Sequence, residues 1–252
     1  MLAPRLCRDL AGTTARTIDA LMPLETVFLD AGGVLVYPNW TRICDALDRH
    51  GVHADPRELA VAEPLAKRRL DVEKTINVTN DASRGWLYFN LVLEAANVAR
   101  SEATDAALAE LHVFHMTNNL WEQVPDGIPD VLAGLVAAGL RLVVVSNANG
   151  TLREHFRRLG LDRYFVRILD SHDEGFEKPD PRLFESALRQ SGATAASTIH
   201  VGDLYQVDVV GARAAGIRGV LLDERGLYED ADCLRVRSLK ALQQEISEGA
   251  FD

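Results

Sequence analysis

Short apolar runs rich in β-branched residues recur along the chain and predict its strands. They occur at 26–30, 141–147, 165–171, 198–203 and 219–223. None of these runs alternates strictly between apolar and polar positions, which is typical of strands buried on both faces. Helical patterns lie between them, at 127–139, 150–160, 180–192 and 206–216. Strands separated by helices of this length indicate right-handed βαβ units. The sequence therefore predicts an α/β fold with a Rossmann-like, doubly wound parallel sheet.

The segment at 38–123 does not follow this alternation. It holds helical patterns at 40–50, 56–70, 83–98 and 105–124, without a strand-like run. Roughly 85 residues between the first and second strands are too many for a simple crossover. We therefore expect the following division: an N-terminal extension at 1–23, a catalytic core at 24–37 and 124–252, and an inserted α-helical cap domain at 38–123. The hinges are expected near Tyr37-Pro38 and at 124–127.

The composition narrows the range of partners and compartments. The chain of 252 residues carries a formal net charge of −10, which disfavours binding to nucleic acid or to anionic membranes. Its cysteines, Cys7, Cys44 and Cys233, are far apart and odd in number, so we expect a reducing compartment without a disulfide framework. No apolar run approaches the roughly 18 residues of a membrane span. The N-terminal extension lacks the apolar region of a signal peptide. We expect a cytoplasmic protein.

Polar residues follow several of the predicted strands. Asp30 ends the first, Ser146 and Asn147 end the second, and Asp203 ends the run "TIHVGD". Lys178 lies in the loop "GFEKPDP". Ligands of open parallel sheets bind beyond the carboxyl ends of the strands, so these groups should meet at one edge. Carboxylates suit Mg²⁺, while a lysine and a hydroxyl suit a phosphoryl group. The pattern predicts a site for Mg²⁺ and a phosphate.

Four ordered motifs resemble those of the haloacid dehalogenase superfamily of hydrolases, most of which are Mg²⁺-dependent phosphatases. They are "FLDAGGVL", "VVVSNANG", "KPDPRLFESAL" and "VGDLYQVDVVGARAAGI", and the last keeps the GDxxxxD spacing. The resemblance covers about residues 25–223. It implies a Rossmann-like core, a cap that selects the substrate, and hydrolysis of a small phosphorylated compound.

The resemblance also implies roles for single residues. Asp30 is the implied nucleophile, forms an aspartyl-phosphate and binds Mg²⁺. The carbonyl of Gly32 and the side chain of Asp203 are the implied further metal ligands. Asp208 would contact the metal through water or orient Lys178, which balances the phosphoryl charge.

The remaining implied contacts are to the substrate. The N–H groups around Gly32 and Gly33 would hold the phosphoryl group, as a backbone nest does. Ser146 would donate a hydrogen bond to the phosphoryl group, Asn147 beside it is a further candidate contact, and Lys178 would bind the phosphoryl group as well.

Gly32 departs from the pattern of the family's phosphatases, which usually carry a second aspartate two residues after the nucleophile. That aspartate protonates the leaving group and activates water, and such catalysis is typically worth ~10²–10⁴-fold. The protein could be a phosphatase whose acid comes from the cap, or one that acts on good leaving groups such as aryl and acyl phosphates. It could also be a non-catalytic phosphate-binding or partner-binding member. A metal-independent 2-haloacid dehalogenase is a further alternative, but the retained Asp203 favours phosphatase chemistry.

Several residues of the predicted cap have a structural and a functional interpretation. His112 and His115 are best explained as packed cap histidines, since no third zinc ligand is apparent. A solvated helix face accounts for Lys67, Arg68, Arg69 and Arg84 better than contact with a substrate anion. Tyr37 and Trp40 are the residues we expect nearest the substrate. The sequence predicts neither the substrate nor the oligomeric state.

Overall fold

A computed structural model describes residues 23–72 and 81–251, and the side chains of 72 and 81–86 are not described. The predicted N-terminal extension thus lies almost wholly outside the described residues. The strands of the core form one parallel sheet in the order β3-β2-β1-β4-β5-β6. Their bounds are β1 Thr26–Leu29, β2 Arg141–Ser146, β3 Arg167–Asp170, β4 Thr198–Gly202, β5 Arg218–Leu222 and β6 Leu234–Val236. The predicted α/β fold is confirmed, and β6 is an addition to it.

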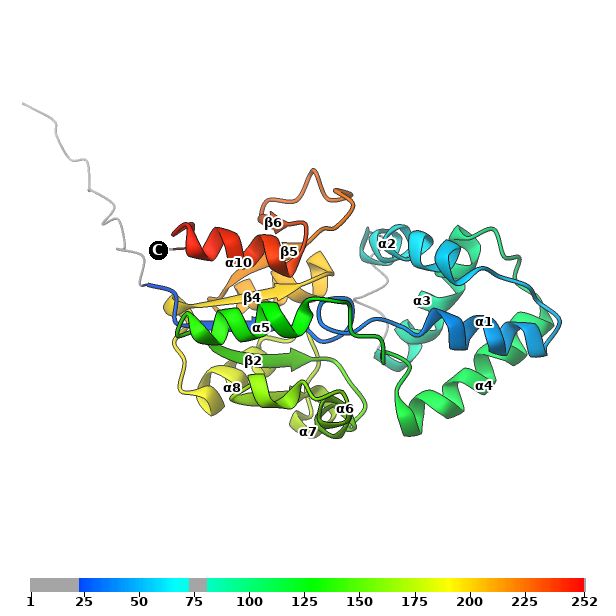
Figure 1. Cartoon of the computed structure of the whole chain (residues 1–252), viewed down its shortest axis with the longest axis horizontal. Coiled ribbons are helices and arrows are strands. Elements are labelled where there is room, and N and C mark those ends of the chain that lie inside the picture. Colours follow the sequence, from blue (N-terminus) through cyan, green and yellow to red (C-terminus); the bar gives the residue numbers. More distant parts are fainter. Residues whose placement is uncertain (1–22, 73–80, 252) are drawn as a thin grey trace, which may run out of the picture.

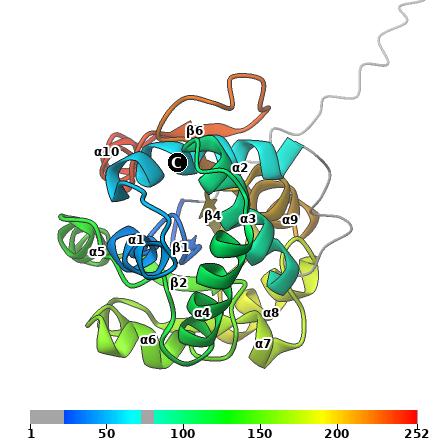
Figure 2. The same ribbon diagram turned by 90° about the vertical axis from the view of Figure 1, so that its right-hand side faces the viewer.

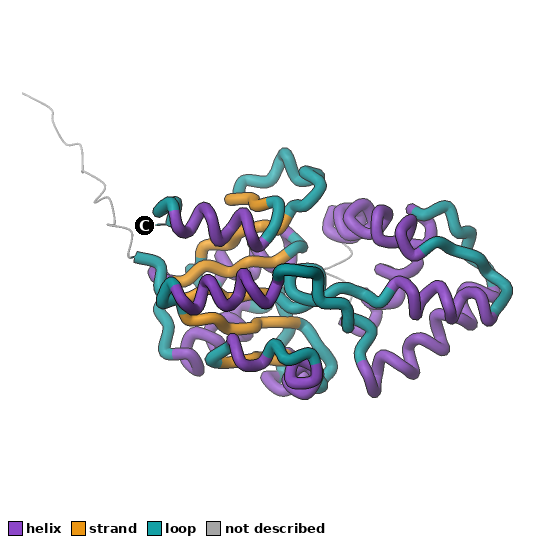
Figure 3. The backbone as a smooth tube through the Cα atoms, viewed as in Figure 1, coloured by secondary structure: helices purple, strands orange, loops and turns teal. Residues whose placement is uncertain are grey.

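Helices cover both faces of the sheet (Figures 1 and 3). In the core they are α5 Ile128–Ala137, α6 Leu152–Arg158, α7 Ser171–Glu174, α8 Pro181–Ser191, α9 Val210–Ala214 and α10 Leu239–Ser247. Single helical turns occur at η2 Asp162–Tyr164, η3 Ala195–Ser197 and η4 Tyr205–Val209, of which η2 and η3 are 3-10 helices and η4 is a π-helix. Because side chains alternate along a strand, Val27 and Leu29 of β1 pack with α5, α6 and α10, whereas Phe28 packs with α8 and α9.

The inserted segment forms a helical cap, as expected. Its helices are α1 Trp40–Arg49, α2 Pro56–Val72, α3 Asp81–Ala95 and α4 Glu102–Asn118. They share a hydrophobic core of their own, distinct from the clusters that pack on the sheet. Figure 2 views the molecule from the cap side, with these helices in front of the sheet. Every helix of the described residues is too short or too polar to cross a lipid bilayer.

Two chain crossings join the cap to the core, and they are paired to each other. The backbone groups of Tyr37 and Gln123 exchange hydrogen bonds of 2.8 and 3.1 Å. Helix α2 makes further contacts with the core. Asp71 accepts hydrogen bonds from the backbone N–H groups of Tyr205 and Gln206, at 2.9 and 2.8 Å. Polar contacts thus hold the cap against the carboxyl edge of the sheet.

Candidate active site

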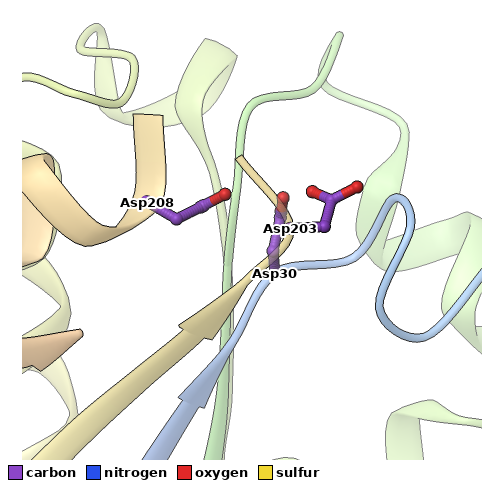
Figure 4. A group of neighbouring side chains, drawn as sticks. All are labelled: Asp30, Asp203 and Asp208. Carbon is purple, nitrogen blue, oxygen red and sulfur yellow. The ribbon is translucent and has the colours of Figure 1, made fainter. Parts of the chain in front are cut away.

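The carboxyl ends of β1 and β4 place three aspartates side by side (Figure 4). Asp30 follows β1 directly, Asp203 follows β4, and Asp208 lies in the turn η4. Their carboxylate oxygens lie within 4.8 Å of one another. β1 and β4 are neighbours at the point where the strand order reverses, which is where open α/β sheets bind their ligands. The predicted meeting of Asp30 and Asp203 is therefore present in the fold.

Lys178 links Asp30 to Asp208. Its buried Nζ lies 2.9 Å from Oδ1 of Asp30 and 2.6 Å from Oδ1 of Asp208. Burial alone would lower the pKa of Lys178, but the two carboxylates outweigh it and raise the pKa, so the ammonium stays charged. Asp208 also accepts hydrogen bonds from His200 Nε2 at 3.0 Å and from the N–H of Leu204 at 3.0 Å. Both oxygens of Asp208 are thus bound, and one of them contacts Lys178.

The contacts of Asp30 involve only one of its two carboxylate oxygens among the described residues. The N–H of Ala31 donates to Oδ1 at 2.7 Å, the same oxygen that Lys178 contacts. Among the described residues, Oδ2 has no hydrogen-bond partner, and Asp30 lines a cavity. One oxygen is thus held by the protein, and the other is available to a ligand.

A chain of polar groups runs from the cap to Asp203. Tyr88 donates to Glu63 at 2.6 Å, Glu63 pairs with Lys67 at 2.8 Å, and Nζ of Lys67 lies 2.7 Å from Oδ2 of Asp203. Burial would lower the pKa of Lys67, but Asp203 and Glu63 outweigh it and raise the pKa. Burial raises the pKa of Asp203, although Lys67 acts in the opposite direction. The expectation of a solvated Lys67 was wrong, because its side chain is only 14% exposed.

Gly33 is required by close packing and by its backbone. Its φ is +75°, and a Cβ there would lie 2.0 Å from Oδ2 of Asp203 and 2.5 Å from Nζ of Lys67. Its N–H donates to the carbonyl of Val36 at 2.8 Å, so this amide is occupied within the loop. That differs from the expectation that Gly33 holds a phosphoryl group. The N–H of Gly32 makes no hydrogen bond within the described residues and is the amide left for a ligand.

Trp121 occupies the space beside Gly32. A Cβ built on Gly32 would lie 3.1 Å from Nε1 and 3.2 Å from Cδ1 of the indole. The backbone of Gly32 is not in the left-handed region, so the indole rather than the backbone opposes a side chain here. The position where the family's phosphatases carry an acid thus faces an aromatic ring.

Ser146 and Asn147 end β2 at the same edge. Within the described part of the chain, the Ser146 hydroxyl makes only a long contact of 3.5 Å, with the carbonyl of Asn147, so it can donate to a ligand. The Asn147 side chain is occupied, since its Oδ1 accepts from the N–H of Lys178 at 2.7 Å and its Nδ2 donates to the Lys178 carbonyl at 3.0 Å. Asn147 therefore positions the lysine loop, and each of its polar side-chain atoms already has one partner.

A cavity of about 580 Å³ lies between the sheet edge and the cap. This size suits a small-molecule site. Its core side includes Asp30, Gly32, Ser146, Asn147, Lys178 and Asp203, whereas Gly33 and Asp208 lie behind the lining. Its cap side is formed by Lys67, Leu70, Tyr88, Phe89, Leu108, Leu111, His112, His115, Met116, Asn119, Leu120 and Trp121.

The cap side of the cavity differs from the expectation. Tyr37 and Trp40 are absent from the described lining, because Tyr37 donates to Glu224 and Trp40 is buried in the cap core. His115 lines the cavity, and its Nδ1 accepts from the N–H of Leu120 at 3.2 Å. Burial, together with His112 and His155, lowers the pKa of His115 to about 4. His115 is therefore uncharged at neutral pH.

The donor atoms of the site fit Mg²⁺. Asp30 and Asp203 supply the hard oxygen ligands that this ion prefers. The carboxylates of Asp30, Asp203, Asp208 and Glu63 face the two ammonium groups of Lys67 and Lys178. A divalent cation would offset this surplus of carboxylates over ammonium groups.

Comparison with known proteins identifies the family of this chain. Residues 24–216 match the haloacid dehalogenase-like hydrolases. The human haloacid dehalogenase-like hydrolase domain-containing protein 3 is 35% identical over 142 residues, which is 56% of each chain. The matches span about half the length of such curated relatives.

Two further relatives are named for different reactions, one a phosphatase and the other a dehalogenase. A phosphoserine phosphatase from Thermus thermophilus is 43% identical over 157 residues, 60% of this chain and 61% of that one. The structure of a 2-haloacid dehalogenase from Pseudomonas syringae is 26% identical, with a TM-score of 0.55, and the match covers 90% of this chain and 99% of that one. Because the family match extends over most of the chain and the motifs converge on one sheet edge, the protein belongs to the haloacid dehalogenase-like hydrolases.

Proposed function

We propose that this hydrolase is a Mg²⁺-dependent phosphatase that transfers a phosphoryl group from a small substrate to Asp30. The observation that carries the proposal is that the two carboxylate oxygens of Asp30 differ in their contacts. Lys178 and the N–H of Ala31 hold Oδ1, and Oδ2 has no partner within the described residues. A nucleophile that is fixed by one oxygen and open at the other is oriented for in-line attack.

The chemistry of the chain's own residues follows from their contacts. Oδ2 of Asp30 forms a bond to phosphorus while the bond from phosphorus to the leaving oxygen breaks, and that oxygen keeps the electron pair. Lys178, the Ser146 hydroxyl and the N–H of Gly32 bind the phosphoryl oxygens. Water then attacks phosphorus, releases phosphate and regenerates Asp30, with the proton passing to solvent.

The metal would be held by the residues that already converge. We propose Asp30, Asp203 and the carbonyl of Gly32 as its ligands. When bound, Mg²⁺ supplies charge neutralisation at the phosphoryl oxygens. We also propose that the cap comprises residues 38–123, hinged at Tyr37 and beyond Gln123.

A metal-independent 2-haloacid dehalogenase is the second candidate. The position of Lys67 favours it, because an ammonium 2.7 Å from Asp203 already supplies positive charge where a metal would otherwise be needed. In that reaction Oδ2 of Asp30 would displace halide from carbon, and water would hydrolyse the resulting ester. The surplus negative charge of the site favours the phosphatase instead.

The two candidates are separated by paired assays on one preparation. Phosphate release from acetyl phosphate in Mg²⁺ and chloride release from 2-chloropropionate in EDTA should be measured side by side. We expect phosphate release alone, and we expect Asp30→Asn to abolish it. Chloride release in EDTA without phosphate release would refute the phosphatase.

Metal binding gives an independent test. Calorimetric titration should show Mg²⁺ binding that Asp203→Asn removes, since one of the ligand carboxylates is lost. Lys67→Gln should leave that binding intact or strengthen it, because the competing ammonium is removed. Exposed Asp230→Asn is the matched control for Asp203→Asn.

A further inference from the structure

The cap side of the cavity is formed largely by aromatic and aliphatic side chains. The Trp121 indole stands beside Gly32, within about 3 Å of where a Cβ would be. Its ring centroid lies 5.5 Å from that of Phe89, 5.9 Å from Tyr88 and 5.4 Å from His115. Leu108, Leu111, Met116 and Leu120 extend this surface along α4 and beyond it. We call Tyr88, Phe89, His115 and Trp121 the aromatic wall.

The charged groups of the cavity do not serve a charged leaving group. Among the described lining residues, the permanent cations are Lys67 and Lys178. Each of them already contacts two carboxylates. A second phosphate or a carboxylate on the leaving group would meet the aromatic wall without a free cation, and burying an unpaired charge is costly.

The missing acid restricts the same group in a second way. With glycine at position 32 and an indole beside it, no carboxyl group stands there to protonate a departing alkoxide. Trp121 cannot substitute for it, because an indole N–H is a hydrogen-bond donor and not a useful acid. A leaving group that departs readily as an anion, such as a phenolate or a carboxylate, needs no such proton.

We propose that the aromatic wall is a leaving-group subsite that selects phosphate esters or anhydrides of uncharged, apolar and preferably aromatic groups, with Trp121 as its specificity-determining residue. This inference rests on the proposed phosphatase function for its reaction. It names the class of substrate, an aryl phosphate or an aromatic acyl phosphate. It also explains why position 32 is a glycine, since the Trp121 indole occupies the space that an acidic side chain would need.

The test compares two substrates that need equal help from an acid. Benzoyl phosphate and acetyl phosphate release carboxylates of closely similar acidity, but only benzoate carries an apolar ring. We expect kcat/KM for benzoyl phosphate to be about 10- to 100-fold higher, the range that a few buried apolar carbons provide. Equal kcat/KM values for the two would overturn the inference while leaving the phosphatase intact.

Variants on α4 locate the effect. Met116 lines the cavity and is 48% exposed, so Met116→Asp should fold and should place a charge beside the ring. It should lower kcat/KM for benzoyl phosphate at least ~10-fold and change kcat/KM for acetyl phosphate by much less. Val113→Asp is the matched control, since Val113 lies on the same helix, is 69% exposed and is absent from the lining. An equal loss on both substrates in Met116→Asp would contradict the subsite.

A binding measurement separates the subsite from the chemistry. Phenylphosphonate and methylphosphonate cannot be hydrolysed, so their affinities report the subsite alone. If neither acyl phosphate is cleaved, the proposed phosphatase fails, but tighter binding of phenylphosphonate would still support the subsite. Equal binding of the two phosphonates would refute the subsite whatever the enzyme's activity.

Discussion

Introducing the absent acid by Gly32→Asp tests the relation between Gly32 and Trp121. The Cβ alone would approach Nε1 and Cδ1 of the indole to 3.1 and 3.2 Å, so the ring must move by a few tenths of an ångström. The indole packs against Tyr88 and Phe89, which resist that movement. Overpacking of this kind costs about 1–3 kcal/mol. For a chain of this length, each kcal/mol lowers Tm by about 2–4 °C.

The expected gain in activity depends on the ring. General acid–base catalysis is worth ~10²–10⁴-fold, but the carboxyl group can act only where the indole now stands. We therefore expect Gly32→Asp alone to raise kcat/KM for an alkyl phosphate by less than about 10-fold. The double variant Gly32→Asp/Trp121→Ala makes room for the carboxyl and should gain about 10²-fold, the low end of that range.

Matched variants separate packing from catalysis. Gly32→Ala adds the same Cβ without a carboxyl, so it should lose similar stability and gain no activity. Trp121→Ala alone should not raise turnover of alkyl phosphates. Melting curves and phosphate release from an alkyl phosphate in Mg²⁺ give both quantities. A Gly32→Asp variant that matches the double variant in stability and activity would refute the role assigned to the indole.

Two more predictions concern the buried titratable side chains Lys178 and His115. Lys178→Met leaves the carboxylates of Asp30 and Asp208 without their shared ammonium, so the free energy of unfolding should fall by about 3–5 kcal/mol in denaturant titrations. The exposed Lys240→Met is its control, and an equal loss in both would contradict this account. His115 has a pKa lowered to about 4 by burial, so the unfolded chain takes up its proton first as pH falls. The contribution of uncharged His115 to the free energy of unfolding is complete above about pH 6.5. It falls by up to about 3 kcal/mol as the pH approaches 4, at roughly 1.4 kcal/mol per pKa unit. Denaturant titrations across this range should therefore show a shallower decline for His115→Gln than for the wild type. His53→Gln, which changes a side chain that is 90% exposed, should keep the wild-type slope.

The sheet and its acidic edge could be predicted because local patterns specify them. Buried strands, helix-starting residues such as Asp180 before Pro181, and polar residues at strand ends are all visible over a few positions. β6 was not predicted, because Leu234 and Arg235 are exposed and give this edge strand no apolar run.

The cap side of the site could not be predicted in the same way. The neighbouring cations of α2 look alike in sequence, and only tertiary packing turns Lys67 toward Asp203. A signal was present nonetheless, since Glu63 and Lys67 are four residues apart and flank the buried stripe of Leu59, Ala66 and Leu70. Trp121 was assigned to a continuing helix, but α4 ends at Asn118, and Asn119 has a φ of +67°. That turn brings the indole to Gly32.

The place of β1 in the sheet also governs when the protein can assemble during synthesis. Thr26 pairs with Arg141 on one side and with Thr198 on the other, and the N–H of Asp30 donates to the carbonyl of Val201. The central strand therefore leaves the ribosome long before either neighbour. The helices α1–α4, which follow it directly along the chain, contact mainly one another. Non-local pairing of this kind is slow and exposes apolar strands to aggregation. Asp30 acquires its surroundings only after β4 has been synthesised, so we expect an incomplete chain to lack the candidate active site.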